Sequence, residues 1–261
     1  MHERAAHDLG VRCHYQLIEV PDADREELRA LLNGVRRLGF SGVNVTFPYK
    51  EAVVGLLDEV SQEAGKIGAV NTVVVRDNRL IGYNTDMTGF ARAAVNLVAG
   101  SRRGSVAVIG AGGVGKAIAF ALVNLGVAEV RIFDADRARA DNLAVLLRSR
   151  ARVIVVECVE DAVQEVIGLV NATPVGMLPS RDIPLPETLL HPGLWVADAV
   201  YFPLWTPLLL AAKAKGARVM TGRELAIYQA AEAFQLFTGL APSTAEMGKA
   251  FDQVMSGARA K

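Results

Sequence analysis

A glycine-rich turn near the middle of the 261-residue chain limits its fold more than any other feature. The apolar run 105–109 is predicted to form a strand, with an apolar helix over 117–125 and a further strand over 128–133. Between the first strand and the helix lie Gly110, Ala111, Gly112, Gly113, Val114 and Gly115. The first glycine of this series permits a tight turn, the second lets the backbone approach a pyrophosphate, and the last lets the helix pack against the strand. This order of elements predicts a Rossmann-like domain that binds a dinucleotide.

An aspartate at the end of the second strand bears on which dinucleotide is bound. Asp134 lies about 20 residues beyond the glycine turn, where a carboxylate accepts from a ribose 2′-hydroxyl and repels a 2′-phosphate. We therefore predict NAD as the cofactor. Arg137 and Arg139 follow closely, and either could turn toward a phosphate. NADP is thus the alternative, and Arg139 is included among the candidate cofactor-binding residues.

A second group of polar residues lies at strand ends in the first hundred residues. The β-branched run 42–47 is predicted to be a buried strand, and Asn44, Thr46 and Lys50 lie near its carboxyl end. Asp86 follows the end of another predicted strand. Because open α/β sheets bind ligands at the carboxyl ends of strands, the lysine and the aspartate could share one cleft. The plainer alternative is a solvated loop lysine and an aspartate that caps a helix.

The remaining pattern predicts an α/β protein of two domains. An N-terminal open α/β substrate domain is expected over 1–100, with helices over 1–9, 24–38 and 86–98, two short helices within 51–65, and strands over 15–20, 42–47, 71–75 and 79–83. A dinucleotide-binding domain is expected over 101–240, with strands near 105–109, 128–133, 152–156, 168–171 and 194–199 and a late helix over 223–237. A last helix, within residues 241–261, is expected to pack back on the first domain.

Composition argues against several classes of function. The 28 Lys and Arg residues balance the 28 Asp and Glu residues, so no overall field favours nucleic acid or a membrane. The four histidines show no paired ligand spacing, which argues against a metal site. Cys13 and Cys158 are far apart and no apolar signal segment begins the chain, so we expect a cytoplasmic protein. The pattern leaves open whether it is a monomer or a homodimer.

Taken together, these motifs resemble those of the shikimate dehydrogenase family, which includes the quinate/shikimate dehydrogenases. The resemblance extends over nearly the whole chain and rests on several segments in a matching order. They are Gly42–Lys50, Ile67–Thr72, Gly82–Asp86, Asn171–Met177, Asp198–Pro203 and Gln229–Ala231. The segment Asn171–Met177 resembles the loop that lies along the nicotinamide in that family.

The resemblance implies a role for each matched residue. Lys50 and Asp86 would form the catalytic acid–base pair. The substrate, a polyhydroxy cyclic acid, would be bound by Asn44, Thr46, Asn71, Tyr201 and Gln229. The cofactor-binding residues would also include Thr173, Met177 and Gly222. For Tyr201, Gln229, Thr173 and Met177, ordinary packing or surface polarity is the alternative interpretation.

The implied reaction is the NAD(P)-dependent interconversion of shikimate and 3-dehydroshikimate, of quinate and 3-dehydroquinate, or of both. Oxidation of a secondary alcohol releases a hydride and a hydroxyl proton, and a positioned side chain must accept the proton. Two alternatives stay open: an enzyme like methylenetetrahydrofolate dehydrogenase, and an inactive protein that binds shikimate or a nucleotide. Asn84–Asp86 and Asn171–Met177 argue against the folate enzyme, and the presence of Lys50 and Asp86 argues against an inactive protein.

One departure from the family concerns the first residues. Family members begin with a strand and a Ser-x-Ser or Ser-x-Thr motif, whose hydroxyls hold the substrate carboxylate, just before a helix of the Met-His-Glu type. This sequence begins with Met1, His2 and Glu3. We therefore expect either a shortened chain or a degenerate protein. Binding of the substrate carboxylate should be weak unless another group, such as Tyr201 or Lys50, holds it.

Overall fold

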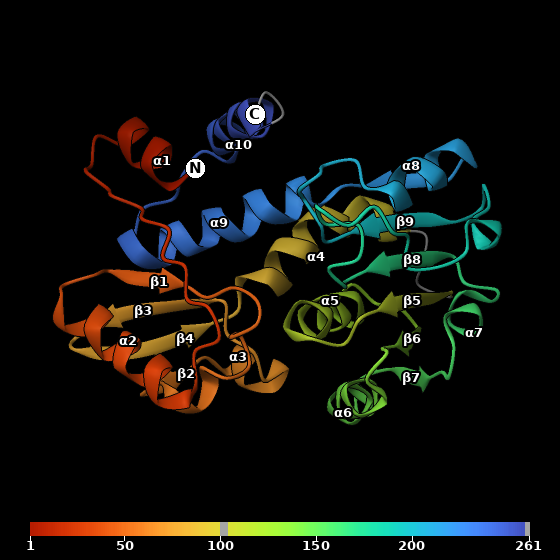
Figure 1. Cartoon of the computed structure of the whole chain (residues 1–261), viewed down its shortest axis with the longest axis horizontal. Helices are drawn as coiled ribbons and strands as arrows, with labels where there is room; N and C mark the ends of the chain where they lie inside the picture. The colour runs from red at the N-terminus through yellow and green to blue at the C-terminus, as the bar shows by residue number, and fades with distance from the viewer. Residues whose placement is uncertain (100–103, 259–261) are drawn as a thin grey trace. The chain divides into compact units, whose positions relative to one another are not determined.

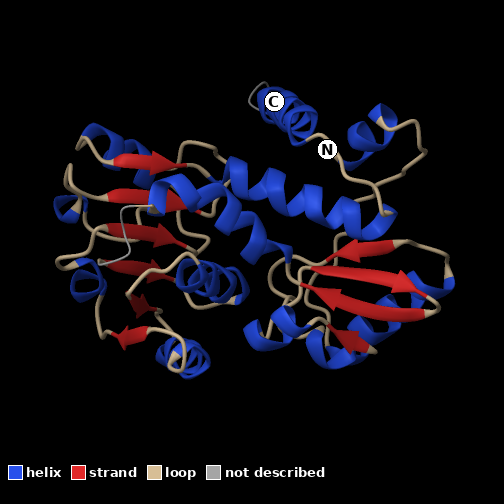
Figure 2. Cartoon of the chain, turned by 180° about the vertical axis from the view of Figure 1, so that it is seen from behind, coloured by secondary structure: helices blue, strands red, loops and turns tan. Residues whose placement is uncertain are grey.

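The structure is a computed structural model that describes residues 1–99 and 104–258. The chain divides into two compact units. Unit 1 comprises Met1–Thr85 and Ile227–Lys261, and unit 2 comprises Asp86–Ala226. Figure 1 labels most of the helices and strands of both units, and Figure 2 colours helices and strands separately.

The boundaries of these units differ from the predicted domain limits at residues 100 and 240. Both boundaries fall inside helices, α4 (Thr85–Val98) and α9 (Gly222–Thr238). The prediction placed the limits in loops, whereas each of these helices begins in one unit and continues into the other. Unit 1 is therefore built from two separate stretches of the sequence.

Unit 1 contains a four-stranded sheet with the order β1-β3-β4-β2. The strands are β1 (Gly42–Asn44), β2 (Glu59–Val60), β3 (Thr72–Arg76) and β4 (Arg79–Tyr83). β3 is antiparallel to both β1 and β4, and β2 is parallel to β4. β3 and β4 form a hairpin whose turn residues, Asp77 and Asn78, have φ of 50° and 59°. Two consecutive positive φ angles are typical of the type I′ turn, which matches the twist of the paired strands.

The helices of unit 1 include one with a clear sequence signal. They are α1 (His2–Asp8), α2 (Arg25–Arg37), the 3₁₀ turn η1 (Val54–Leu56), α3 (Gln62–Ile67) and α10 (Thr244–Ala258), together with most of α9. α2 begins at a capping box in which Asp24 accepts from the backbone of Glu27 and the Glu27 carboxylate accepts from the backbone of Asp24. α10 packs against α1, and Arg4 forms an ion pair with Glu246 at 3.5 Å.

The predicted strand over 15–20 is wrong. Among the described residues no strand pairs with this segment, and Leu17 and Ile18 are 79% and 56% exposed. Its apolar and β-branched residues indicated a strand, but a strand also needs a neighbour that completes its hydrogen bonds. The predicted strand over 42–47 is shorter than expected and ends at Asn44. The chain turns just beyond it, where the Tyr49 backbone N–H donates to the Thr46 carbonyl at 3.0 Å.

Unit 2 contains a six-stranded sheet in which every neighbouring pair is parallel. The order is β10-β9-β8-β5-β6-β7, which is the doubly wound order of the Rossmann fold. The strands are β5 (Ser105–Ile109), β6 (Glu129–Phe133), β7 (Arg152–Val155), β8 (Gly168–Asn171), β9 (Trp195–Asp198) and β10 (Arg218–Met220). The sequence predicted the first five, whereas β10 is too short to give a recognisable pattern.

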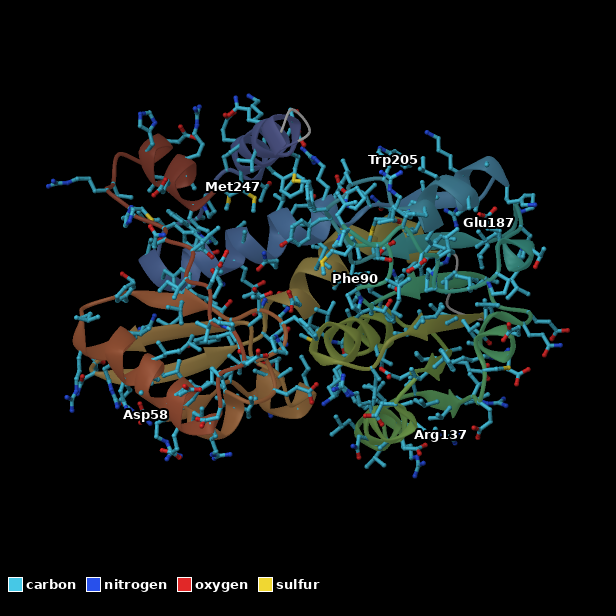
Figure 3. The ribbon with its side chains drawn as sticks, in the orientation of Figure 1. Asp58, Phe90, Arg137, Glu187, Trp205 and Met247 are labelled. Carbon is cyan, nitrogen blue, oxygen red and sulfur yellow. The ribbon has the colours of Figure 1, made fainter. Side chains whose placement is uncertain are left out.

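The helices of unit 2 alternate with these strands. They are α5 (Gly113–Asn124), α6 (Arg137–Leu147), α7 (Val159–Val163), the 3₁₀ turn η2 (Glu187–Leu189) and α8 (Pro207–Ala214), together with most of α4. Phe90, labelled on α4 in Figure 3, is 1% exposed. β8 and β9 consist entirely of buried residues, as is usual where helices cover both faces of a parallel sheet. Within residues 1–99 and 104–258, no helix is long and apolar enough to cross a membrane.

Candidate functional site

The strand ends in unit 1 bring polar residues to one edge of its sheet. The register pairs Asn44, at the end of β1, with Thr72, at the start of β3, and pairs Thr72 with Tyr83, at the end of β4. Asn71 directly precedes Thr72, and Thr85 lies two residues beyond Tyr83. Residues from three segments of the chain therefore meet at the same edge.

These segments are joined by a network of neutral side chains, here called the strand-end network: Tyr15, Asn44, Asn71, Thr72 and Thr85. The Tyr15 hydroxyl donates to Asn44 Oδ1 at 2.9 Å, and Asn44 Nδ2 donates to Thr72 Oγ1 at 3.0 Å. Asn71 Oδ1 accepts from the Thr85 backbone N–H at 2.8 Å, while Asn71 Nδ2 donates to Thr85 Oγ1 at 3.0 Å. Because Asn71, Thr72 and Thr85 are buried, the bonds among these three residues are shielded from water and fix the ends of β3 and β4, whereas the bond from Tyr15 to Asn44 is exposed.

The strand-end network contains two of the predicted substrate-binding residues, Asn44 and Asn71, and engages the amide atoms of both. Sequence reasoning missed the contributions of Tyr15, Thr72 and Thr85. Polar residues at the ends of apolar strands were a signal for both threonines. No local signal marks Tyr15, which lies 29 residues from Asn44 in a segment that forms no strand.

The three other predicted substrate-binding residues lie outside the network. Thr46 is exposed in the turn after β1. Gln229 is half-buried on the part of α9 that belongs to unit 1. Tyr201 belongs to unit 2, follows β9 and is 52% exposed. Substrate binding by these three residues stays a prediction.

The main chain of Lys50, and that of Thr85 just before Asp86, are hydrogen-bonded to the segment Val70–Asn71. The Lys50 carbonyl accepts from the Val70 backbone N–H at 2.8 Å, and Lys50 is half-buried. Asn71 holds the backbone N–H of Thr85, and Asp86 is the next residue. Asp86 is 5% exposed and lies in the first turn of α4. Lys50 belongs to unit 1, whereas Asp86 is the first residue of unit 2, so their pairing stays a prediction.

The glycine turn in unit 2 needs glycine at two of its positions. Gly110 has φ of +99°, and a Cβ there would lie 2.9 Å from Thr173 Cγ2. A Cβ on Gly115 would lie only 2.0 Å from the Gly110 carbonyl oxygen. At Gly112 a Cβ would meet only Arg139, at 4.0 Å. Gly112 therefore leaves space beside the N-terminus of α5, where backbone amides and the helix dipole favour a phosphate group.

This turn lies where the strand order of the sheet reverses. β5 has β6 on one side and β8 on the other, and ligands of doubly wound sheets bind at this position. The loop after β8 starts at Ala172, whose carbonyl carbon would lie 2.9 Å from a Cβ on Gly110. The glycine turn and the loop that contains Thr173 are therefore neighbours, as a shared cofactor site requires.

Asp134, at the end of β6, is fixed by two backbone donors. Its Oδ2 accepts from Ala111 N–H in the glycine turn at 2.6 Å, and its Oδ1 accepts from Asp136 N–H at 2.8 Å. Arg137, labelled in Figure 3, forms ion pairs with Asp141 and Glu157. Arg139 pairs with Asp136 at 3.4 Å and lies near Gly112. A carboxylate and one arginine thus flank the turn.

The loop after β8 rests on a buried carboxylate that sequence reasoning missed. Asp198 is 1% exposed and accepts hydrogen bonds from Asn171 Nδ2, the Val200 backbone N–H and Thr206 Oγ1, at 3.0, 2.9 and 2.7 Å. Burial raises the pKa of Asp198 to about 6, and these three donors oppose the rise. Trp205, labelled in Figure 3, directly precedes Thr206.

The remaining predicted cofactor-binding residues differ in exposure. Val114 lies in the first turn of α5 and is partly buried. Met177 is 46% exposed at the end of the loop after β8. Gly222 starts α9 and lies against the main chain that follows β9, because a Cβ there would be 2.5 Å from the Val200 carbonyl oxygen. Gly222 is therefore tightly packed. In the sequence it lies far from both the glycine turn and β8. Among the described residues no group of three or more His, Cys, Asp or Glu side chains could hold a metal ion.

Comparison with known proteins agrees with this arrangement. Residues 1–73 match the family described as shikimate dehydrogenase substrate binding domain, and residues 83–166 match the ThiF family. A shikimate dehydrogenase (NADP(+)) of Streptomyces avermitilis is 42% identical, over 95% of this chain and 87% of the relative. The chain belongs to the shikimate dehydrogenase family. The predicted family resemblance is thereby confirmed.

Other family members extend the comparison. A quinate/shikimate dehydrogenase (NAD(+)) of Corynebacterium efficiens is 43% identical, over 96% of this chain and 91% of the relative. The structure of a quinate dehydrogenase from Corynebacterium glutamicum in complex with NAD has a TM-score of 0.86 and 39% identity, with 97% of this chain and 92% of that chain covered. A shikimate 5-dehydrogenase from Thermus thermophilus, in complex with NADP(H) and shikimate, has a TM-score of 0.85 and 41% identity at the same coverage. These likenesses confirm the predicted fold class, α/β with a Rossmann-like domain.

Proposed function

We propose that this protein oxidises and reduces shikimate, quinate or both with NAD as the preferred cofactor, and that Lys50 and Asp86 are its acid–base pair. The observation that carries the reaction is that the Lys50 carbonyl bonds Val70 while Thr85, the residue before Asp86, bonds Asn71 of the strand-end network. Membership of a family whose relatives are named as shikimate and quinate/shikimate dehydrogenases supports it. It also favours this function over that of a folate dehydrogenase.

The proposed chemistry divides between the two kinds of residue. A bound nicotinamide would supply the acceptor for the hydride of the alcohol carbon. The hydroxyl proton passes to Lys50 Nζ, and Asp86 orients the hydroxyl and the lysine. The neutral amides and hydroxyls of the strand-end network suit this role because they fix the local backbone without adding charge. Positioned acid–base catalysis of this kind contributes roughly a hundred- to ten-thousand-fold in rate.

The cofactor preference rests on Asp134. Its carboxylate is held at the end of β6 by backbone donors from both sides, so a 2′-phosphate on the adenosine ribose would meet a fixed negative charge. Arg137 is engaged by Asp141 and Glu157, and Arg139 by Asp136, but Arg139 is the arginine that a Cβ on Gly112 would meet. Relatives named for NAD and for NADP occur at similar identity, so the proposal depends on this carboxylate.

The test is a steady-state assay of the wild-type protein with shikimate and with quinate, each with NAD and with NADP. We expect turnover of at least one substrate and a higher kcat/KM with NAD. A higher kcat/KM with NADP would overturn the assignment of Asp134. Binding of NAD without turnover of either substrate would overturn the reaction and support an inactive, ligand-binding protein.

A further inference from the structure

Asp198, the last residue of β9, is hydrogen-bonded to the last residue of the neighbouring strand β8, just before the loop that follows β8. The register of β8 and β9 pairs Asn171 with Asp198, and the Asp198 Oδ1 atom accepts from Asn171 Nδ2 at 3.0 Å and from Val200 N–H at 2.9 Å. Its Oδ2 atom accepts from Thr206 Oγ1, at the N-cap of α8. Both Asn171 and Asp198 are almost fully buried. This carboxylate has no part in the chemistry proposed above.

The carboxylate is one of the groups that set the orientation of the Asn171 amide. Asn171 Nδ2 also donates to the Val175 carbonyl at 3.1 Å, while its Oδ1 accepts from Thr173 N–H at 3.1 Å and Thr173 Oγ1 at 2.7 Å. Because an ionised carboxylate only accepts, a flipped amide would place Oδ1 against the Asp198 carboxylate and the Val175 carbonyl. It would also place Nδ2 against the Thr173 N–H. Asp198, the Val175 carbonyl and the Thr173 N–H therefore favour the same amide orientation, the one that holds the turn over residues 173–175.

The position of this turn affects the cofactor site directly. Thr173 Cγ2 and the Ala172 carbonyl carbon both lie 2.9 Å from where a Cβ on Gly110 would be. With the pyrophosphate at the start of α5 and the adenosine ribose at Asp134 after β6, the other half of a dinucleotide lies on the β8 side of β5. The loop after β8 is therefore the part of unit 2 that the nicotinamide half meets.

We propose that Asp198 is a positioning residue that acts through Asn171 to hold the Thr173–Met177 loop against the nicotinamide half of the cofactor. This inference rests on the proposed use of a nicotinamide dinucleotide. It predicts that loss of the Asp198 acceptor impairs the handling of nicotinamide while the adenosine half binds normally. Misplacement of a reacting group by about 1 Å can cost roughly a hundredfold in rate.

The experiment compares Asp198→Ala, Asp198→Asn and Thr206→Val with the wild-type protein. For each, we would measure the Kd of NAD, the Kd of ADP-ribose, which lacks nicotinamide, the hydride-transfer rate and the melting temperature. Asp198→Ala should weaken NAD binding and slow hydride transfer, by about tenfold or more, with no change in ADP-ribose binding. Asp198→Asn keeps a carbonyl oxygen for Asn171 and should recover most of the loss. Thr206→Val, which removes only the bond to Oδ2, should lower the melting temperature and leave the ratio of the two Kd values unchanged.

Several results would overturn the inference. They are equal losses of NAD and ADP-ribose binding in Asp198→Ala, a Thr206→Val variant with the same kinetic defect, or an Asp198→Ala variant that behaves like the wild type. Should Asp198→Ala fail to fold, Asn171→Ala tests the same link, and normal NAD binding and hydride transfer in that variant would also contradict the inference. The two Kd values remain measurable in a protein without turnover, so failure of the proposed reaction would be seen separately in the wild-type assay.

Discussion

The polar clusters of the two units are built in different ways. In unit 1 the strand-end network consists of neutral amides and hydroxyls that bond to one another and to the backbone. In unit 2 the buried or partly buried carboxylates Asp134 and Asp198 accept from backbone N–H groups and neutral side chains, beside a turn that depends on glycine. The comparison indicates that backbone conformation shapes the proposed cofactor site, whereas bonding between side chains holds the strand ends of unit 1.

The largest effect should come from the glycine turn in unit 2. Gly115→Ala would place a Cβ 2.0 Å from the Gly110 carbonyl oxygen and should destabilise unit 2 by about 3 kcal/mol or more, since backbone must move. Gly112→Ala meets only Arg139 at 4.0 Å, so it should leave stability unchanged and weaken NAD binding. Denaturation followed by tryptophan fluorescence measures unit 2 specifically, because Trp195 and Trp205 both belong to it. Equal stability of the two variants would refute the dependence on Gly115.

The next effect concerns the strand-end network in unit 1. Asn71→Ala removes the acceptor for the Thr85 backbone N–H and the donor for Thr85 Oγ1, both buried. Unsatisfied buried groups of this kind should destabilise unit 1 by roughly 2–3 kcal/mol. Thr46→Ala, at an exposed position, is the matched control and should be neutral. Hydrogen exchange of the β3 and β4 amides would measure both, and equal protection in the two variants would count against the network.

A smaller expected effect concerns pH, which should change the stability of the two units in opposite directions. Burial lowers the pKa of His2, in unit 1, from 6.5 to about 4, so its contribution to stability is present above pH 6.5 and is lost as pH falls toward 4. Burial raises the pKa of Asp198, in unit 2, from 3.8 to about 6, so its contribution is present below pH 3.8 and is lost as pH rises through 6.

Acidification from pH 7 to pH 5 should therefore destabilise unit 1 and stabilise unit 2, each by about 1–2 kcal/mol. Hydrogen exchange resolved by segment, corrected for the intrinsic rate at each pH, would measure the two responses. His2→Phe should abolish the response of unit 1, because the aromatic rings of Tyr15, Phe234 and Phe237 surround this position. Asp198→Asn should abolish the response of unit 2. Responses of the same sign in both units would contradict these assignments.

The contrast between local backbone patterns and bonds between distant side chains explains which features the sequence could predict. The glycine turn, α5 and the strands β5, β6, β7, β8 and β9 are encoded by local spacing and apolar runs, so they were recognised. Asn44 and Asn71 were proposed on resemblance, but the bond from Tyr15 to Asn44 depends on packing between distant segments. The pairing of Asn171 with Asp198 depends on the register of β8 and β9, which no local pattern specifies. The segment 15–20 shows that a strand-like pattern is insufficient without a partner strand.

The unit boundaries illustrate a further limit. Loops are the usual places for a domain boundary, and the sequence offered one near residue 100. α4 and α9 are instead continuous helices that belong to both units, and continuity of a helix gives no sign of where compact units separate. α10 belongs to unit 1 because it packs against α1. This contact is between the two ends of the sequence, so no local sequence pattern specifies it.

The most direct test of this account is the turnover of Lys50→Ala, measured together with its affinity for NAD. If unit 1 supplies the proton acceptor and unit 2 binds the cofactor, kcat for shikimate or quinate oxidation should fall by at least about a hundredfold, with little change in the Kd of NAD. The Lys50 carbonyl, which accepts from Val70, is unchanged in this variant, and the melting temperature shows whether the variant is folded. A variant that retains near-normal kcat would show that Lys50 is not the essential acid–base residue and would contradict the central claim.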